Sequence, residues 1–397
     1  MSVRVVITGI GPVCALGLGR QAFADGLRAA ASGIRELTLF DAEPFGSILG
    51  AEVPDFDVND YLSGNKAYLD RSSELALAAM RLALDDAGID DKTTATAGLA
   101  LGTAFGSIDT MTLFYEDVLE KGPRYAKPIL FPHTYSNTAI SLIAIEHDMQ
   151  GYHANFSSGG ISSDLALLDA VDQVRHGRCD VVFAGGVEAL SETLFNACAL
   201  RGWLSPGPTG GDEHCAPFDA TRNGFVLGEG ACMLVLENEE HARARKANII
   251  AEISACVAAG DHATPGSGIS PALAALMGPD TLPIDAVVAH ANGSVDLDAY
   301  EAAGIAAVPA LRDTSVTSIK PILGETLGAA GIFQVAAAAV SMQDAQLAPI
   351  RELRSPVSGD VKFVTGRARV GPLNRIATVT LDAGGGVATT LLERESE

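Results

Sequence analysis

Apolar runs and amphipathic segments alternate along the chain. Continuous apolar runs at 3–9, 97–102 and 179–186 are typical of buried strands, and each run ends in glycine. In segment 69–88 apolar residues recur at i, i+3 and i+4, and Gly88 is placed to end a helix. The same criteria predict further helices at 20–31, 107–121, 161–176 and 324–342, and further strands at 249–259, 284–290, 314–319, 375–381 and 387–393.

The order of these elements suggests an internal repeat. Segment 249–259 resembles the opening strand, and the alternation of strands and helices starts again there. We therefore expect an α/β protein of two related halves, 1–248 and 249–397, each a sheet covered by helices. Because no low-complexity linker separates the halves, we expect them to share a large interface. Gly9 and Gly11 are expected to form a tight turn at the end of the first strand.

The stretch 151–164, GYHANFSSGGISSD, joins a strand to a helix through small residues. Such a turn presents one side chain, here Phe156, at the N-terminus of the helix. The free N–H groups and the dipole of a helix N-terminus stabilise a thiolate or an oxyanion. The turn therefore has the form of a nucleophile elbow, but a benzyl side chain cannot act as a nucleophile.

Composition and charge narrow the class of protein. The formal net charge of −22 argues against a nucleic-acid partner, since phosphate binding needs a basic surface. Six scattered cysteines without metal-ligand spacing are expected to be reduced, and no metal or cofactor is expected. The chain opens on a strand-like segment rather than a signal peptide, and no apolar window is long enough to span a bilayer. We therefore expect a cytoplasmic protein without a membrane span.

Five sequence blocks carry a family resemblance. They are VVITGIGPVCALG near the start, FDATRNGFVLGEGACMLVLE, VVAH followed by Asp298 and Glu301, VTSIKPILGETLGAAG, and a closing glycine-rich loop. In this order they resemble the β-ketoacyl synthases, the elongating condensing enzymes of the thiolase fold. The resemblance covers nearly the whole chain. It implies a thiolase-like α/β fold with two related halves in a layered α-β-α-β-α arrangement.

The resemblance also assigns the reactive positions. In active members a Cys at the elbow takes the acyl chain as a thioester, and two His residues activate the malonyl extender. The Cys position falls on Phe156, and the two His positions fall on His290 and Glu325. A carboxylate at position 325 would repel the developing enolate. The supporting Lys and Glu are retained as Lys320 and Glu301. The resemblance thus implies a chain that does not condense by itself, with Phe156 filling the former active site.

Two further features of the site follow from the same resemblance. Lys320 and Glu325 are expected to form an ion pair, or to join a buried polar network with His290 and Glu301 that is kept for structure. The closing loop, usually a Gly-Phe-Gly-Gly gate, has lost both phenylalanines, and its residues here include Leu381, Ala383, Gly384 and Gly385.

One branch of this family lacks the nucleophilic Cys: the chain-length factors, or ketosynthase β-subunits, of type II polyketide synthases. Segment FYEDVLEKGPRYAKP resembles their interface helix, whose tunnel-gating positions fall on Ile108, Met111 and Tyr115. This spacing places the three side chains on one helix face, and from the residues alone simple core packing explains such a face. The resemblance implies a heterodimer with an active ketosynthase α-subunit, an acyl carrier protein as a second partner, and a growing acyl chain in the tunnel. Chain-length factors commonly carry Gln at the Cys position. Phe156 departs from that pattern and fits equally the β-subunits of systems that make aryl polyenes or other reduced polyenes.

Two other functions remain open from the sequence. A self-standing acyltransferase or hydrolase, rebuilt around His290 and Ser157, would turn over thioesters without a partner. Ser157 and Ser158 follow the tip of the elbow by one and two residues, so their side chains are expected to point elsewhere than the nucleophile's. A homodimeric binding or scaffold protein would have neither an acyl role nor a ketosynthase partner.

Overall fold

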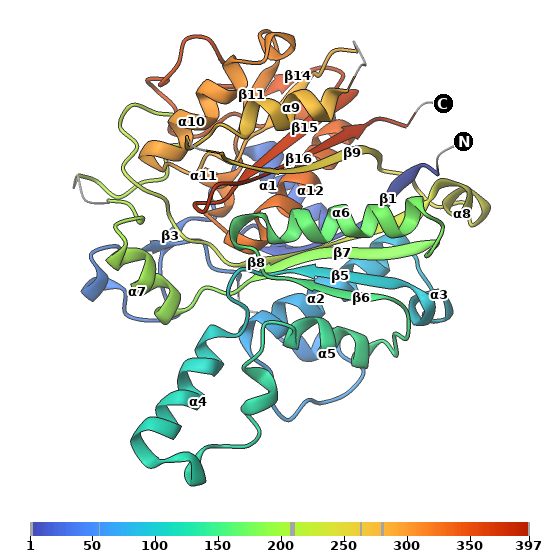
Figure 1. Ribbon diagram of the computed structural model, residues 1–397, viewed down its shortest axis with the longest axis vertical. Helices are drawn as coiled ribbons and strands as arrows, with labels where there is room; N and C mark the ends of the chain where they lie inside the picture. Colours follow the sequence, from blue (N-terminus) through green and yellow to red (C-terminus); the bar gives the residue numbers. More distant parts are fainter. Residues whose placement is uncertain (1–2, 55, 207–210, 263, 279–281, 396–397) are drawn as a thin grey trace.

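The computed structural model describes residues 3–395 except 55, 207–210, 263 and 279–281 (Figure 1). Its main sheet has the strand order β13-β11-β10-β15-β16-β9-β1-β8-β7-β5-β6, and β2 pairs with β1. The bounds of these strands are β1 Val5–Cys14, β2 Gly17–Leu18, β5 Gly98–Gly102, β6 His153–Phe156, β7 Val181–Glu188, β8 Gly230–Asn238, β9 Ala251–Gly260, β10 Ala286–Val288, β11 Ser315–Thr317, β13 Lys362–Phe363, β15 Arg375–Leu381 and β16 Gly386–Glu393. Two small ribbons pair β3 (Arg35–Glu36) with β4 (Leu49–Gly50) and β12 (Gln346–Leu347) with β14 (Arg369–Val370).

The two ends of the main sheet share one pairing pattern. In one half β5 pairs in parallel with β6 and β7, and β7, β8 and β1 follow in antiparallel pairs. In the other half β10 pairs in parallel with β11 and β15, and β15, β16 and β9 follow in antiparallel pairs. The halves meet in a short pairing of β1 with β9, where Val6 lies opposite Glu252. This repeated order is what two related halves require; the boundary at 248/249 stays a prediction.

The helices complete a five-layer arrangement (Figure 1). Two central helices, α6 and α12, contact strands of both halves, whereas α2 and α5 cover the outer face of one half and α9 and α10 cover that of the other. The helix bounds are α1 Gly19–Ala29, α2 Arg71–Ala87, α3 Asp91–Thr96, α4 Ile108–Lys121, α5 Thr138–Glu146, α6 Ser162–Arg175, α7 Glu192–Leu200, α8 Glu239–Ala244, α9 Ile269–Met277, α10 Val295–Ala306, α11 Lys320–Leu323 and α12 Ala330–Asp344. The α/β class and the layered order predicted from the sequence are confirmed.

The prediction of a turn at Gly9 and Gly11 is wrong, because β1 runs through both residues to Cys14. Both glycines instead let α2 approach the strand. A Cβ added at Gly9 would lie 2.8 Å from the carbonyl oxygen of Ala83, and one added at Gly11 would lie 2.2 Å from that of Ala79. The glycines therefore serve close helix–strand packing, which a hydrophobicity pattern cannot distinguish from a turn.

The predicted helix starting at residue 324 begins later, at Ala330. Gly324 has a left-handed φ of +71°, which ends the short α11, and the 3₁₀ turn η7 (Leu327–Ala329) precedes α12. Glu325 therefore lies in an irregular connection between two helices. The helix predicted at 69–88 is present, with Gly88 at its C-cap at φ 63°. Among the helices of the described residues, none is long and apolar enough to cross a bilayer.

The connection between β5 and β6 contains α5, which packs on α2, and a preceding part that leaves the body of the molecule. This preceding part contains α4, which projects away from the sheets in Figure 1. Large apolar side chains are exposed along the connection: Phe105, Met111, Leu113, Tyr115, Leu119, Tyr125, Ile129, Phe131, Tyr135, Ile145 and Tyr152. Such a concentration of exposed apolar side chains is unusual for a surface that meets only water.

Candidate functional site

The elbow is built where β6 turns into α6. Phe156 is the last residue of β6, and it pairs with Gly102 of β5 in parallel register. Ser157 and Ser158 follow, and the 3₁₀ turn η5 (Gly159–Ile161) leads directly into α6. A Cβ at Gly102 would lie 2.3 Å from the amide nitrogen of Ser163. The absence of a side chain there lets the start of α6 pack against the sheet.

Phe156 is half-buried and packs against the larger hydrophobic core of the chain. The side chain at the nucleophile position therefore serves as a packing group. Within the described residues no hydrogen bond joins the hydroxyls of the exposed Ser157 and Ser158 to a histidine. The amide of Ser158 instead donates to Ser162 Oγ at 2.8 Å, which stabilises the turn.

His290 lies just beyond the end of β10 and is buried. Burial lowers the pKa of its imidazole to about 4, so the ring is neutral near pH 7. Its Nδ1 atom has no hydrogen-bond partner among the described residues. Glu301 of α10 holds the loop rather than the ring: its carboxylate accepts from the backbone N–H groups of His290 and Ala291, each at 2.8 Å. Burial raises the pKa of Glu301 to about 8.

Glu325, at the second His position, is the centre of a buried polar network. Lys320 Nζ lies 2.8 Å from Glu325 Oε1, and Asn292 Nδ2 donates to Glu325 Oε2 at 2.7 Å. The backbone N–H of Leu327 also donates to Oε1 at 2.8 Å. Burial alone would raise the pKa of Glu325, but the Lys320 charge and these donors hold it below its ordinary value. Glu325 is therefore a fixed anion, and its Oε2 lies 3.7 Å from Nε2 of the neutral His290.

The closing loop joins β15 to β16 and lies against the elbow. Leu381 is buried at the end of β15, whereas Ala383 and Gly384 are exposed and Gly385 has a left-handed φ of +89°. The fifth residue, Asp382, accepts a hydrogen bond from the backbone N–H of Gly160 at 2.7 Å. The motifs place Asp382 in the closing loop but give it no role, because its partner is a backbone amide 222 positions away.

Glu188 is a second residue that the motifs leave out. It ends β7, is buried, and accepts from the backbone N–H groups of Ala104, Phe105 and Gly328. Burial raises its pKa to about 7. The carboxylate thereby ties the loop that leads into α4 to the turn that leads into α12. A charged residue at the end of an apolar strand was the signal available in the sequence.

The three proposed gating residues lie on α4, but they differ in burial. Ile108 is half-buried and packs against a small apolar cluster, whereas Met111 and Tyr115 are 39% and 56% exposed. Simple core packing therefore does not account for Met111 and Tyr115 in the single chain. Both side chains belong to the exposed apolar surface of the projecting segment.

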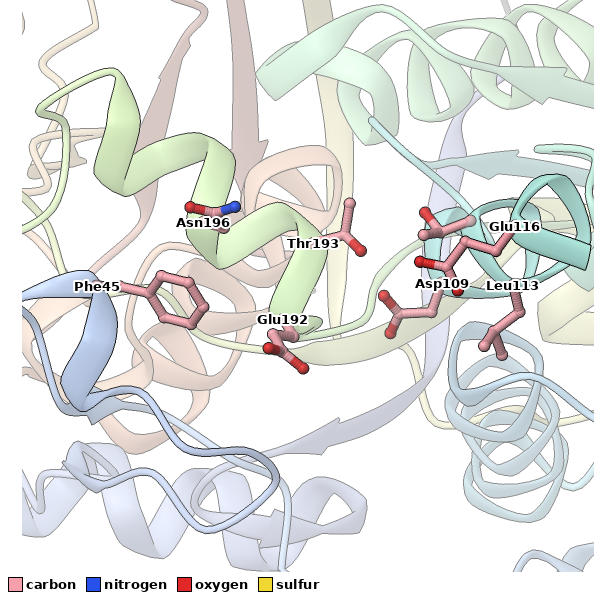
Figure 2. A pocket seen from close by; sticks show the side chains of 8 residues that line it. Phe45, Asp109, Leu113, Glu116, Glu192, Thr193 and Asn196 are labelled. Atoms are coloured by element: carbon pink, nitrogen blue, oxygen red, sulfur yellow. The ribbon is translucent and has the colours of Figure 1, made fainter. Parts of the chain in front are cut away.

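A cavity of about 470 Å³ lies beside this helix, between α4 and α7 (Figure 2). Its walls carry three carboxylates, Asp109, Glu116 and Glu192, together with the apolar side chains of Phe45 and Leu113. Figure 2 shows α4 contributing Asp109, Leu113 and Glu116 to the cavity. None of the elbow or Lys320–Glu325 residues lines it. Helix α4 therefore has an acidic cavity face that is distinct from the Met111–Tyr115 face.

Comparison with known proteins identifies the family. The beta-ketoacyl synthase N-terminal domain matches residues 2–242, and the beta-ketoacyl synthase C-terminal domain matches residues 255–354. The chain belongs to the β-ketoacyl synthase family. A 3-oxoacyl-[acyl-carrier-protein] synthase 2 of Coxiella burnetii is 30% identical over 98% of both chains.

Two solved structures are similar to this β-ketoacyl synthase family member over its whole length. The ishigamide ketosynthase/chain length factor has a TM-score of 0.92 and 27% identity and covers 100% of both chains. A beta-ketoacyl synthase from Burkholderia phymatum has a TM-score of 0.90 and 27% identity, covering 99% of this chain and 100% of its own. The thiolase-like fold expected from the sequence blocks is confirmed.

Proposed function

We propose that this chain is a non-condensing, ketosynthase-like subunit, a chain-length factor, that pairs with an active β-ketoacyl synthase and shapes the tunnel in which the acyl chain grows. The observation that carries the proposal is the pair of substitutions at the reactive positions. Phe156 ends the strand where a family nucleophile would stand, and Glu325 is a fixed anion where a histidine would activate the extender. Neither group can form an acyl thioester or stabilise an enolate.

The electrostatics of the site support this proposal. Decarboxylation of a malonyl group develops negative charge on the thioester oxygen, which donors and cations stabilise. Here the ammonium group of the buried Lys320 is already paired with Glu325 at 2.8 Å. The carboxylate thus removes the charge that would favour the enolate, while the neutral His290 remains beside it.

The surface of the chain also supports the proposal that it binds a partner. β6 ends the main sheet, and within the described part of the chain no strand pairs with its free edge. The exposed apolar segment 105–152 runs directly into this strand. An unpaired edge beside exposed apolar side chains is what a subunit interface requires. One of the similar structures is described as a ketosynthase/chain length factor. This description fits an active ketosynthase as the partner that covers the edge of β6 and the exposed apolar side chains.

The proposal includes an acyl carrier protein as the second partner, since family members named among the relatives act on carrier-bound acyl groups. The growing acyl chain would reach the face of α4 that presents Met111 and Tyr115. Phe156, in place of the Gln common in chain-length factors, is the reason to include aryl polyene systems among the candidates.

The decisive experiment is co-expression of the chain with an active ketosynthase from the same genome. Size analysis and product analysis follow, with carrier protein and malonyl donor. We expect the two chains to co-purify and products to form only when both are present. Thioester turnover by this chain alone would overturn the proposal and favour an acyltransferase or hydrolase built on His290 and Ser157. A stable homodimer that does not bind the ketosynthase would favour the alternative of a binding or scaffold protein.

A further inference from the structure

The closing loop holds the elbow through a carboxylate. Asp382 Oδ1 accepts from the backbone N–H of Gly160 at 2.7 Å, and Asp382 Oδ2 accepts from that of Gly384 at 2.7 Å. One carboxylate therefore joins the turn that opens α6 to its own loop. The backbone closes the loop as well, since the N–H of Gly385 donates to the carbonyl of Asp382 at 2.9 Å. A negative charge at this end of α6 is also stabilised by the helix dipole.

The two glycines of the elbow are fitted to this carboxylate. A Cβ added at Gly159 would lie 2.1 Å from Asp382 Oδ1, and one added at Gly160 would lie 2.8 Å from the carbonyl oxygen of Leu381. Gly159 also has a left-handed φ of +62°, which side chains rarely adopt. The elbow therefore has no side chain of its own between its backbone and Asp382.

A second acidic side chain, Asp164, joins the start of α6 to the strand that leads into the loop. Asp164, in the first turn of α6, is buried, and its Oδ1 lies 3.0 Å from the hydroxyl of Thr380 at the end of β15. The same hydroxyl lies 3.1 Å from Oε1 of Gln334 on α12. Thr380 and Asp382 are separated by one residue, so the two contacts hold both sides of Leu381.

We propose that Asp382 and Asp164 latch the closing loop over the elbow, so that the N-terminus of α6 is closed to an acyl thioester by the chain itself. The latch rests on the proposed function, because it explains how a non-condensing subunit keeps acyl groups away from its own vestigial site. A carbonyl oxygen entering the elbow would have to displace Asp382 from Gly160. It would also bring developing negative charge beside that carboxylate.

Amide hydrogen exchange of the purified full chain, or of its complex with the ketosynthase, tests the latch. In Asp382→Ala we expect exchange in peptides covering 157–164 and 381–387 to rise about tenfold or more, because a charge-assisted hydrogen bond is lost at each end. Asp382→Asn keeps one acceptor oxygen and should give a smaller rise. Thr380→Val should raise exchange in the closing loop without removing the Asp382 contact.

Asp90→Asn is the matched control, since Asp90 also accepts a helix N-terminal amide, that of Thr93 at 2.8 Å, far from the elbow in sequence. It should leave exchange at the elbow and the closing loop unchanged. Equal exchange in wild type and in folded Asp382→Ala would overturn the latch. This readout needs no carrier protein or malonyl donor, so it is independent of the product assay that tests the proposed function.

A second measurement tests closure directly. In Phe156→Cys the introduced thiol reports access to the elbow through its rate of alkylation by iodoacetamide, followed on the elbow peptide by mass spectrometry. Adding Asp382→Ala should accelerate alkylation about tenfold or more, because the loop is released and a nearby negative charge is removed. Equal rates in the single and double variants would show that the loop does not close the site.

Discussion

A buried carboxylate at position 325 changes the charge balance around Lys320 and His290. The ammonium and the carboxylate lie 2.8 Å apart, and both side chains are almost fully buried. Taking two charges out of water is costly unless each satisfies the other, and removing one partner leaves the other uncompensated. The pair is therefore a unit, and its energetic role is visible only when one member is removed.

We expect Lys320→Met to destabilise the chain by about 3–5 kcal/mol, because Glu325 would then remain buried with only amide donors. The free energy of unfolding in urea measures this effect. The double variant Lys320→Met/Glu325→Gln should recover most of the loss, since no buried charge is left. A double variant as unstable as the single one would show that the pair contributes by packing and not by charge.

Asp164 gives the stability of the chain a pH dependence. Burial raises the pKa of its carboxyl to about 7, and Oδ2 has no hydrogen-bond partner among the described residues. Gln334 Nε2 donates to two carbonyl oxygens, so Gln334 Oε1 faces Thr380. The single proton of the Thr380 hydroxyl cannot serve both Gln334 and Asp164. A proton on Asp164 resolves this conflict.

Because the folded chain holds this proton more tightly than the unfolded chain, the stabilisation is complete below about pH 4. It is lost as the pH rises toward 7. The contribution of Asp164 to the free energy of unfolding should fall by about 1 kcal/mol per pH unit within that window. Urea unfolding of wild type and of Asp164→Asn across this range measures it, and the variant should show the shallower decline. Asp172→Asn, at an exposed position of the same helix, should match wild type.

The buried polar network could be predicted at the level of residue types. Lys320 and Glu325 are charged residues in an apolar sequence block, so pairing was the expected outcome once that block was placed inside the fold. Asp382 could not be found in the same way. Its function depends on an amide of a distant turn, and backbone amides have no signature in the sequence.

At the scale of the element, α4 is the helix whose role depends most on what surrounds it. Its apolar spacing predicted a helix correctly, and the observed bounds are Ile108–Lys121. The spacing could not distinguish a helix face that packs on the core from one that is exposed in the single chain and available to bind another protein. The difference appears only in the fold, where the connection carrying α4 leaves the sheet (Figure 1).

We expect Met111→Ala and Tyr115→Ala, in the complex with the ketosynthase, to lengthen the product by at least one extender unit. Smaller side chains on this face would leave more room for a growing chain. Mass spectrometry of the released products measures the change. Leu113→Ala removes an apolar side chain from the cavity face of the same helix and should leave the product length unaltered. Unchanged products from an intact complex of Met111→Ala or Tyr115→Ala would remove α4 as the chain-length determinant.

At the scale of the whole molecule, the layered core and the projecting segment that carries α4 (residues 107–135) differ in how far the sequence alone determines their structure. The core is fixed by apolar strands, by two central helices and by glycines at close approaches, and most of this could be inferred from the sequence. The projecting segment exposes many of its apolar side chains, which the ketosynthase would cover under the proposed function.

Leu119→Glu places a charge on the most exposed apolar side chain of the projecting segment, which is 82% exposed. We expect it to weaken pairing with the ketosynthase about tenfold or more, because a carboxylate would be buried at the interface. Leu200→Glu is the matched control, since Leu200 is 81% exposed but lies on α7. Titration calorimetry or size analysis of the mixed chains measures both. Equal weakening by the two variants would place the interface elsewhere.

The register of β5 with β6, together with the packing of α5 on α2, makes the part of the connection that carries α4, residues 107–135, exchangeable. Gly102 and Phe156 are held side by side by the sheet, so the chain leaves and returns at neighbouring points whatever lies between. The elbow needs only that its strand reach this register. Recombination between relatives within this segment would therefore transfer a preference for a partner as a cassette, while the layered core and the elbow were inherited unchanged.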